Sequence, residues 1–296
     1  MSTVLIAANP RSGSRSRTDL VERLAHHIQA AGFLCEVVTD LDLLTERSHE
    51  LQESRQLRAT IAAGGDGTVN AVVSRIPLGA SLGVLPLGSE NLLAKHYGFS
   101  LDPEACCRRL VANRTEILDA MDIDGHLALL MASLGFDASV VRRVHQNRRA
   151  HITRWAYRYQ AFRTWFTYRW PPMEVAAPAP EPKSAVNSIY RTQWCFLFNF
   201  PRYATGLQIV PEADPTDGLL DVGLFERSGA IRGVFQYWDV LRGRHRTRSD
   251  WKQFRAESIR VTANALVQPD VQIDGDWVCS TPVSVKVLPK RFRLLV

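Results

Sequence analysis

The residues that could carry chemistry in this 296-residue chain are concentrated in one segment, Gly64-Gly65-Asp66-Gly67-Thr68. Adjacent glycines let a backbone approach a ligand closely, and Asp66 adds a carboxylate beside them. The segment follows the apolar run Ala59–Ala63 and precedes a helical stretch containing Val69–Val73, so it predicts a phosphate-binding loop at a helix start. It is not a Walker A loop, because the chain contains no Gly-Lys-Ser/Thr, and it is not a dinucleotide fingerprint, because Asn70 replaces the third glycine.

Two further polar segments also follow apolar runs. Pro86-Leu87-Gly88-Ser89-Glu90-Asn91 offers a glycine, a hydroxyl and an amide, and Asn9-Pro10-Arg11-Ser12-Gly13 offers a similar set near the start of the chain. For Asn9–Gly13, an ordinary turn explains these residues as well as phosphate binding does. Three such segments at the ends of parallel strands nevertheless favour one shared site.

Strands and helices alternate through the first third of the chain, and this alternation must position the loops. The pattern predicts strands at Thr3–Ala8, Phe33–Val38, Ala59–Ala63 and Ser81–Leu85, and helices at about Thr18–Ala31 and Thr45–Arg58. Such alternation predicts an α/β fold with a doubly wound parallel sheet, whose loops collect at the carboxyl ends of the strands.

After about Met121 the strands follow one another without regular helices, which predicts an antiparallel, β-rich sandwich or barrel and a domain boundary near residues 119–125. Strands are predicted at Leu127–Ser133, Ile189–Asn199, Gly218–Phe225, Ser258–Thr262, Val271–Ile273 and Val283–Leu288. Pro171–Pro182 holds five of the fifteen prolines and is predicted to be an exposed linker or loop.

The composition excludes several classes of protein. Hydrophobic residues make up 46% and charged residues 22%, which is typical of a globular chain. The five cysteines form no CxxC pair, which favours free thiols in a reducing compartment over disulfides or zinc. No run approaches the ~18 apolar residues of a membrane span, and Met1–Ile6 lacks the basic start of a signal peptide. We therefore expect a cytoplasmic protein.

The positive charge is concentrated in one segment, residues 138–173, which contains eight arginines, eight aromatic residues and no acidic residue. Without these eight arginines the formal net charge would be −2 instead of +6. A basic, aromatic surface predicts an anionic partner, either a nucleic acid or a lipid membrane.

Six segments in chain order resemble the motifs of the diacylglycerol kinase catalytic-domain family, which includes bacterial lipid kinases and sphingosine kinases. The first three are Asn9-Pro10-x-Ser12-Gly13, Gly64-Gly65-Asp66-Gly67-Thr68-Val69-Asn70 and Pro86-Leu87-Gly88-Ser89-x-Asn91. The last three are Gly135-Phe136-Asp137-Ala138, Asp217-Gly218-Leu219-Leu220-Asp221 and Ile273-Asp274-Gly275-Asp276. The resemblance runs from residue 4 to the end of the chain, and the ordered set is far more specific than any single motif.

This resemblance implies a lipid kinase that transfers the γ-phosphoryl group of ATP to a hydroxyl of a diacylglycerol-like or sphingoid lipid. It implies an ATP-binding α/β domain at residues 1–122 and a β-rich lipid-substrate domain at 123–288, with the nucleotide in the cleft between them. The second domain would carry a basic aromatic insertion at 139–182, and a final strand at about 289–296 would return to the first domain.

The resemblance also implies site residues. ATP would be bound by Asn9, Ser12, Gly13, Thr39, Gly64, Gly65, Asp66, Gly67, Thr68, Val69, Asn70, Gly88, Ser89 and Asn91. Asp66 and its waters would hold Mg²⁺, and Asp217 with the carbonyls of Asp214 and Leu219 resembles the structural magnesium site of the bacterial members. Asp276 stands where the family has its proposed general base, and Asp66 is the alternative base.

Two departures from the family pattern bear on the substrate and the mechanism. Many members have Asn-Asp where this chain has Asn91-Leu92, so one carboxylate of the presumed magnesium network is missing. Asp276 replaces the usual glutamate and is shorter by one methylene. The sequence leaves open which lipid is phosphorylated, which nucleotide is preferred, and whether the protein is a homodimer.

Two other functions compete with the lipid kinase. A soluble NAD kinase-like enzyme shares the Gly-Gly-Asp-Gly loop, and a non-catalytic binder of anionic membrane could retain a degenerate nucleotide site. The third motif, Ser89-Glu90-Asn91-Leu92, and the basic aromatic segment favour the lipid kinase.

The basic aromatic segment predicts a helix that docks on a membrane. Apolar residues at 152, 155, 159, 162 and 166 share one helix face, which would pack inward, and Arg154, Arg158 and Trp165 lie on another stripe, which would face outward. We expect peripheral, salt-sensitive contact with anionic membrane, and no nucleic-acid partner.

Overall fold

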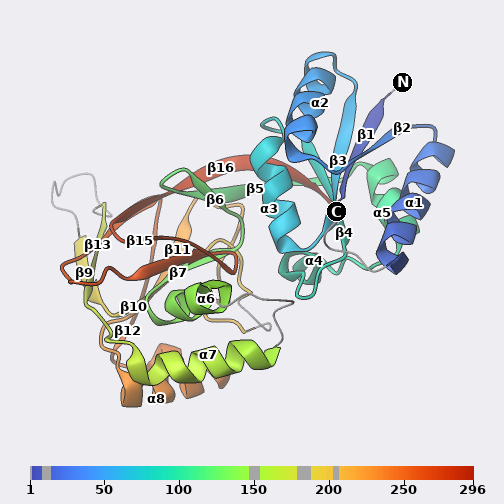
Figure 1. Ribbon diagram of the computed structural model, residues 1–296. Helices are drawn as coiled ribbons and strands as arrows, with labels where there is room; N and C mark the ends of the chain where they lie inside the picture. The colour runs from blue at the N-terminus through green and yellow to red at the C-terminus, as the bar shows by residue number, and fades with distance from the viewer. Residues whose placement is uncertain (1, 9–14, 147–153, 179–187, 203–206) are drawn as a thin grey trace. The chain divides into compact units, whose positions relative to one another are not determined.

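The computed structural model describes residues 2–8, 15–146, 154–178, 188–202 and 207–296. The chain divides into two compact units (Figure 1): Met1–Asp119 with Pro289–Val296, and Ala120–Leu288. Strands β5 (Thr115–Ile123) and β16 (Val283–Leu295) each contribute residues to both units.

The first unit is a parallel sheet with helices on both faces. Its strands lie in the order β2-β1-β3-β4, followed by the end of β16, where Arg293 pairs in parallel with Ser81. Side chains of α1, α5 and the strands, among them Leu24, Ile61 and Leu110, form a buried cluster. The elements are β1 (Thr3–Ala8), α1 (Arg15–Ala30), β2 (Leu34–Val38), α2 (Leu41–Glu53), β3 (Leu57–Gly64), α3 (Asp66–Arg75), β4 (Ser81–Pro86), α4 (Leu92–Tyr97) and α5 (Pro103–Ala112).

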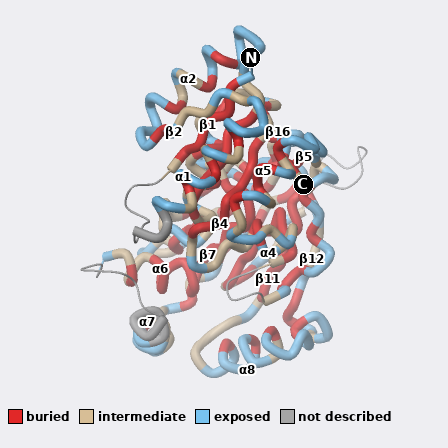
Figure 2. The backbone as a smooth tube through the Cα atoms, turned by 90° about the vertical axis from the view of Figure 1, so that its right-hand side faces the viewer, coloured by how far each residue is buried: buried red, intermediate tan, exposed pale blue. Residues whose placement is uncertain are grey.

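The second unit contains two packed β-sheets. One sheet has six antiparallel strands in the order β12-β11-β10-β7-β14-β15, and the other pairs the start of β16 with β13, then β8 and β9. Val175 and Val261 from one sheet and Leu197 and Val222 from the other belong to one buried core. Figure 2 colours the buried stretches of the backbone red. The predicted α/β fold with a parallel first part and an antiparallel, β-rich second part is confirmed.

The elements of the second unit include three helices and a short 3₁₀ turn. They are β6 (His126–Ala128), β7 (Met131–Leu134), α6 (Phe136–Gln146), α7 (Arg154–Thr167), β8 (Met173–Ala177), β9 (Ser188–Thr192), β10 (Trp194–Phe198), β11 (Leu220–Phe225), α8 (Ala230–Leu241), η3 (His245–Thr247), β12 (Trp251–Ala256), β13 (Ser258–Ala263), β14 (Asp270–Ile273) and β15 (Asp276–Ser280). The sequence pattern does not predict β5, β12 or β15.

Several predicted element boundaries are wrong for identifiable reasons. Helix α2 begins at Leu41 instead of Thr45, because the Asp40 carboxylate accepts the N–H groups of Asp42 and Leu43 at 2.9 Å and starts the helix there. The helix stops before Arg55, whose φ of 57° lies in the left-handed region.

The prediction of an exposed loop over Pro171–Pro182 is wrong for Met173–Ala177, which forms β8 between β9 and β13. Met173, Val175 and Ala177 alternate into the core, and the neighbouring prolines flank this alternation without interrupting it.

The predicted outward position of Trp165 on the basic aromatic helix is also wrong. Trp165 packs against Phe136 with ring centroids 4.7 Å apart and donates its indole N–H to the Ala230 carbonyl at 2.7 Å. Tyr159, Phe162 and Phe166, which were expected to pack inward, are 58%, 65% and 69% exposed. His151 and Ile152, and the side chains of Arg154, Trp155 and Arg158, lie outside what the structure describes.

None of the helices in the described part of the chain combines the length and the hydropathy that crossing a bilayer requires.

Candidate functional site

The loops that follow β3 and β4 touch through their backbones. The Leu87 N–H donates to the Gly64 carbonyl at 2.9 Å, and a Cβ added to Gly88 would lie 2.4 Å from the Gly65 Cα. Strands β3 and β4 are neighbours in the parallel sheet, so their carboxyl ends deliver these two loops to the same edge. Only glycines allow the loops to come this close.

Helix α3 starts inside the first of these loops. The Gly65 carbonyl accepts the N–H groups of Thr68 and Val69 at 2.9 and 3.0 Å, which makes the first helical turn. A helix start concentrates N–H groups and positive dipole, and it is an anion-binding feature where a ligand can reach it. Gly67 lies exposed on this turn, and a Cβ there would have no atom within 4 Å. No packing constraint in the described structure therefore requires a glycine at position 67.

The Asp66 carboxylate ties α3 to α4. One oxygen accepts the Leu92 N–H at 2.9 Å and the other accepts the Leu93 N–H at 3.3 Å. Burial raises the pKa of the Asp66 carboxyl above its usual value, and the two backbone hydrogen bonds and Lys95 only partly oppose that rise. Each carboxylate oxygen keeps a second lone pair, so Asp66 can still accept from a water or a cation.

The remaining predicted nucleotide residues of the first unit differ in what they contact. Asn91, at a left-handed φ of 50°, donates its side-chain amide to the carbonyls of Pro86 and Gly88 at 3.1 and 2.9 Å and so closes its own loop. The side chain of Val69, on α3, is buried. Only the backbone of Val69 can therefore face a ligand. Thr39 and Ser89 are exposed, and Asn70 is half-buried. Asn9, Ser12 and Gly13 lie outside the described residues.

Asp276 belongs to the second unit and is the first residue of β15. Its side chain is 65% exposed, and its Oδ1 lies 3.2 Å from Nε2 of His145. Two other residues of α6, Ser139 and Arg142, bind Asp270 at 2.6 and 2.8 Å. One face of α6 therefore holds both strands of the β14–β15 hairpin.

Asp274 fixes the turn that presents Asp276. Its carboxylate accepts the N–H groups of Leu129, Leu130 and Met131 at 2.8 to 3.0 Å. These bonds interrupt the strand predicted over Leu127–Ser133, which is two strands, β6 and β7, in the structure. The first aspartate of this motif is thus a structural anchor, and the second is free to face solvent.

The loop predicted to bind magnesium through Asp214, Asp217 and Leu219 has an arginine guanidinium beside it. Arg255 lies 3.5 Å from the Asp217 carboxylate and 3.1 Å from that of buried Asp221. Asp217 and Asp214 also accept the N–H groups of Leu219 and Thr216, both at 2.9 Å. Among the residues that the structure describes, no three acidic, His or Cys side chains are grouped to hold a metal ion.

The sequence prediction missed His145 as a partner of Asp276. The two residues are far apart in the chain, and no spacing relates them. Asp137, in the fourth motif, proves to be structural, because it accepts hydrogen bonds from Ser133 and from the Trp194 indole, the latter at 2.7 Å. The structure places the nucleotide-type residues in one unit and Asp276 in the other.

Comparison with known proteins gives two family matches that together span most of the chain. Residues 3–123 match the diacylglycerol kinase catalytic domain, and residues 131–296 match the YegS C-terminal NAD kinase beta sandwich-like domain. A diacylglycerol kinase of Mycobacterium tuberculosis is 26% identical over 247 residues, covering 80% of this chain and 76% of that protein. A YegS-like lipid kinase of Pseudomonas aeruginosa is 28% identical over 239 residues, covering 79% and 75%.

Solved structures share the fold at low sequence identity. A diacylglycerol kinase structure from Bacillus anthracis matches with a TM-score of 0.65 and 13% identity, covering 99% of this chain and 96% of that chain. An NAD kinase from Archaeoglobus fulgidus in complex with ATP matches with a TM-score of 0.53 and 12% identity, covering 100% and 94%.

Gly67 has open space around its Cα and Gly88 does not, so alanine at these two positions should have opposite effects on the free energy of unfolding. Gly67→Ala should raise the free energy of unfolding by up to about 1 kcal/mol, because the methyl meets open space and helical glycine is entropically costly. It should weaken ATP binding about tenfold if the phosphates approach this backbone. Gly88→Ala, the matched control, should cost about 1–3 kcal/mol, because its methyl would overlap Gly65. Denaturant unfolding and ATP titration measure both; unchanged ATP binding in Gly67→Ala would contradict a phosphate at this turn.

Asp66→Asn should change how the stability of the protein depends on pH. The raised native pKa means that the native state holds the Asp66 proton more tightly than the unfolded chain, so the unmodified protein loses stability as pH rises above about 4. The variant lacks this loss, and its Tm relative to the unmodified protein should increase from about pH 4 to pH 7. Thermal unfolding without magnesium measures this difference, and Asp19→Asn, at an exposed position of α1, controls for the removal of one charge. A Tm difference that shrinks with pH would overturn the assignment.

Proposed function

The chain belongs to the family that combines a diacylglycerol kinase catalytic domain with a YegS C-terminal domain, and on that premise we propose that it transfers the γ-phosphoryl group of ATP to a lipid hydroxyl. The family and its named relatives indicate a lipid kinase. The proposal adds ATP as the donor, a hydroxyl as the acceptor and a role for each site residue.

The observation that carries the proposal is the contact between the loops after β3 and β4. It leaves an exposed helix start at Gly67, without a packing reason for glycine, next to the Asp66 carboxylate. Phosphoryl transfer requires in-line positioning and neutralisation of charge more than covalent help from the protein. Backbone N–H groups and the α3 dipole suit the first unit to hold the phosphates.

Asp276 would act on the acceptor. It would take the hydroxyl proton while the acceptor oxygen bonds to the γ-phosphorus and the bond from that phosphorus to the bridging oxygen breaks, so that ADP leaves. The exposed position of Asp276 lets a lipid hydroxyl reach it, and the contact with His145 would hold one of its oxygens in a single orientation.

Magnesium suits one of its two predicted positions. Mg²⁺ is usually bound through one or two carboxylates together with substrate phosphates, and Asp66 offers a half-buried carboxylate with lone pairs to spare. An ion there would neutralise charge on the phosphates. At Asp214, Asp217 and Leu219 the Arg255 guanidinium competes with a cation, and we derive no step through an ion at that loop.

The test is incubation with labelled ATP and separate acceptors: short-chain diacylglycerol, sphingosine, ceramide, phosphatidylglycerol and NAD. Label in one of the lipids, lost in Asp66→Asn by about 10²–10³-fold, supports the proposal. Label in NAD alone would favour the soluble NAD kinase-like alternative. ATP binding without transfer to any acceptor would favour the non-catalytic binder.

Asp276 and His145 are predicted to act as a pair. Asp276→Asn should lower kcat by about 10²–10⁴-fold with little change in the KM for ATP, and Asp276→Glu should preserve or raise activity. His145→Gln should lower kcat about tenfold and, because it acts through Asp276, should cost nothing further in the Asp276→Asn background.

Steady-state kinetics of the single and double variants checks this pair. Additive losses would make His145 independent of Asp276. Normal turnover in Asp276→Asn would reassign the proton to another group, with Asp66 the first candidate.

A further inference from the structure

The apolar face of helix α8 points toward solvent. The residues on its inner side include Gly233, Gln236 and Val240. The residues on its outer side are large and apolar, and all are between 43% and 79% exposed: Ile231, Val234, Phe235, Tyr237, Trp238 and Leu241. Helices of globular proteins normally bury such a face and expose the polar one, so this orientation calls for an explanation.

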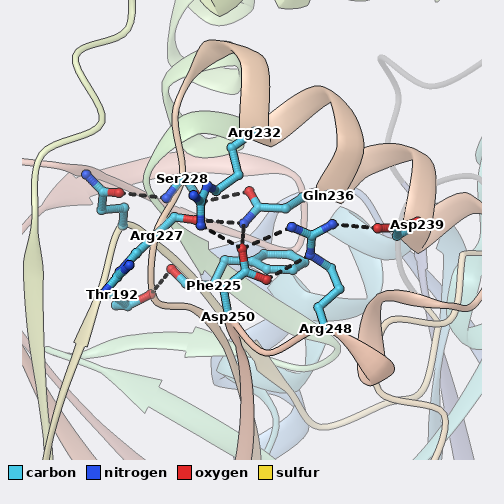
Figure 3. Close-up of polar contacts among 10 residues, drawn as sticks. Thr192, Phe225, Arg227, Ser228, Arg232, Gln236, Asp239, Arg248 and Asp250 are labelled. Carbon is cyan, nitrogen blue, oxygen red and sulfur yellow. Dashed lines mark hydrogen bonds and ion pairs between the residues drawn. The ribbon is translucent and has the colours of Figure 1, made fainter.

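A buried polar cluster holds α8 in this orientation (Figure 3). Gln236, which is fully buried, donates to the Asp250 carboxylate at 3.2 Å and to the Arg227 carbonyl at 2.7 Å. Arg248 binds Asp250 at 2.8 Å and Asp239 of the helix at 2.6 Å. Although burial alone would raise it, the bonds and charge of Arg248 hold the pKa of Asp250 below its usual value. The inner face of α8 is therefore specified by polar bonds, which leaves the apolar residues outside.

Helix α7 adds three exposed aromatic side chains beside α8. The Trp165 indole donates to the Ala230 carbonyl at 2.7 Å, and a Cβ on Gly233 would lie 3.0 Å from the same ring. Figures 1 and 2 show both helices at the bottom of the second unit. Tyr159, Phe162 and Phe166 remain exposed on α7, and we call them, with the six outer residues of α8, the α7–α8 face.

The charge on the α7–α8 face is positive. Residues 230–248 contain five arginines, of which Arg232, Arg246 and Arg248 pair with Asp250, Glu212 and Asp239. Arg163, Arg169, Arg242 and Arg244 are exposed. Arg242 lies over the exposed Trp238 ring, 4.3 Å from its centroid, which puts a positive charge directly beside an aromatic side chain.

We propose that the α7–α8 face docks on the surface of an anionic lipid bilayer, with its aromatic side chains at headgroup level and its arginines on the lipid phosphates. Aromatic rings favour the headgroup region, and anionic lipids attract arginines close to the surface. The proposal deepens the proposed function, since it names where the enzyme would meet a bilayer that contains its substrate.

Charge favours a bilayer over a second copy of the chain. A twofold dimer through this face would place the same surface on both partners and would bring its arginines together. An anionic bilayer instead supplies opposite charge to exposed arginines such as Arg242 and Arg244, and an apolar layer for the rings.

The test is sedimentation of the full chain with vesicles of phosphatidylserine and phosphatidylcholine in equal parts, or of phosphatidylcholine alone, without ATP or acceptor. Phe235→Ser with Trp238→Ser should weaken binding about 100-fold, because two large apolar groups no longer insert. Arg163→Gln with Arg242→Gln should weaken binding to the anionic vesicles about 25-fold and leave neutral vesicles unaffected. Ile189→Ser with Leu266→Ser removes two residues that are 64% and 102% exposed on other elements and should bind as the unmodified protein does.

Circular dichroism and Tm show that each variant is folded, and sedimentation velocity gives its oligomeric state. Failure of the unmodified protein to bind anionic vesicles, or full binding by Phe235→Ser with Trp238→Ser, would overturn the proposal. A dimer that this variant dissociates, without vesicle binding, would assign the face to a second copy. Because the vesicles contain no acceptor, loss of the kinase proposal would leave this result intact.

Discussion

The close contact between Gly65 and Gly88 is the constraint on which the first unit's site depends. Strands β3 and β4 bring their loops to one edge, but only two residues without side chains let the backbones meet. The contact then allows the Asp66 carboxylate to reach the first N–H groups of α4. The helix start, the carboxylate and the second loop become one rigid group because each is bonded to the next.

The position of Asp66 between these loops makes the charged form of its carboxylate unfavourable. Burial raises its pKa, so the charged form is less stable in the folded protein than in water, even with two backbone bonds. A neutral asparagine would bury no charge, but its amide nitrogen could not accept the N–H group that the second carboxylate oxygen accepts. A half-buried carboxylate with a raised pKa at the centre of the loops is typical of a functional site.

The second unit uses its acidic residues in several ways that the sequence does not distinguish. Asp274 and Asp137 are bonded inward and hold a turn and a helix start, whereas Asp276 is exposed and contacts His145. Asp250 is a third kind, a buried charge that Arg248 neutralises and that anchors α8. One residue type thus builds the unit and also supplies its candidate chemistry.

The sequence by itself determined the fold class, the kinase family and the order of the loops, because strand and helix periodicity and glycine-rich motifs are local properties. It also located the basic aromatic segment. Only the tertiary structure decided which side of a helix faces solvent: Trp165 turns inward and Phe162 outward because Gly233 and the Ala230 carbonyl lie beside α7. It likewise decided that His145 meets Asp276 and that Arg255 meets Asp217. These contacts join residues far apart in the chain, and no spacing encodes them, since packing between elements brings them together.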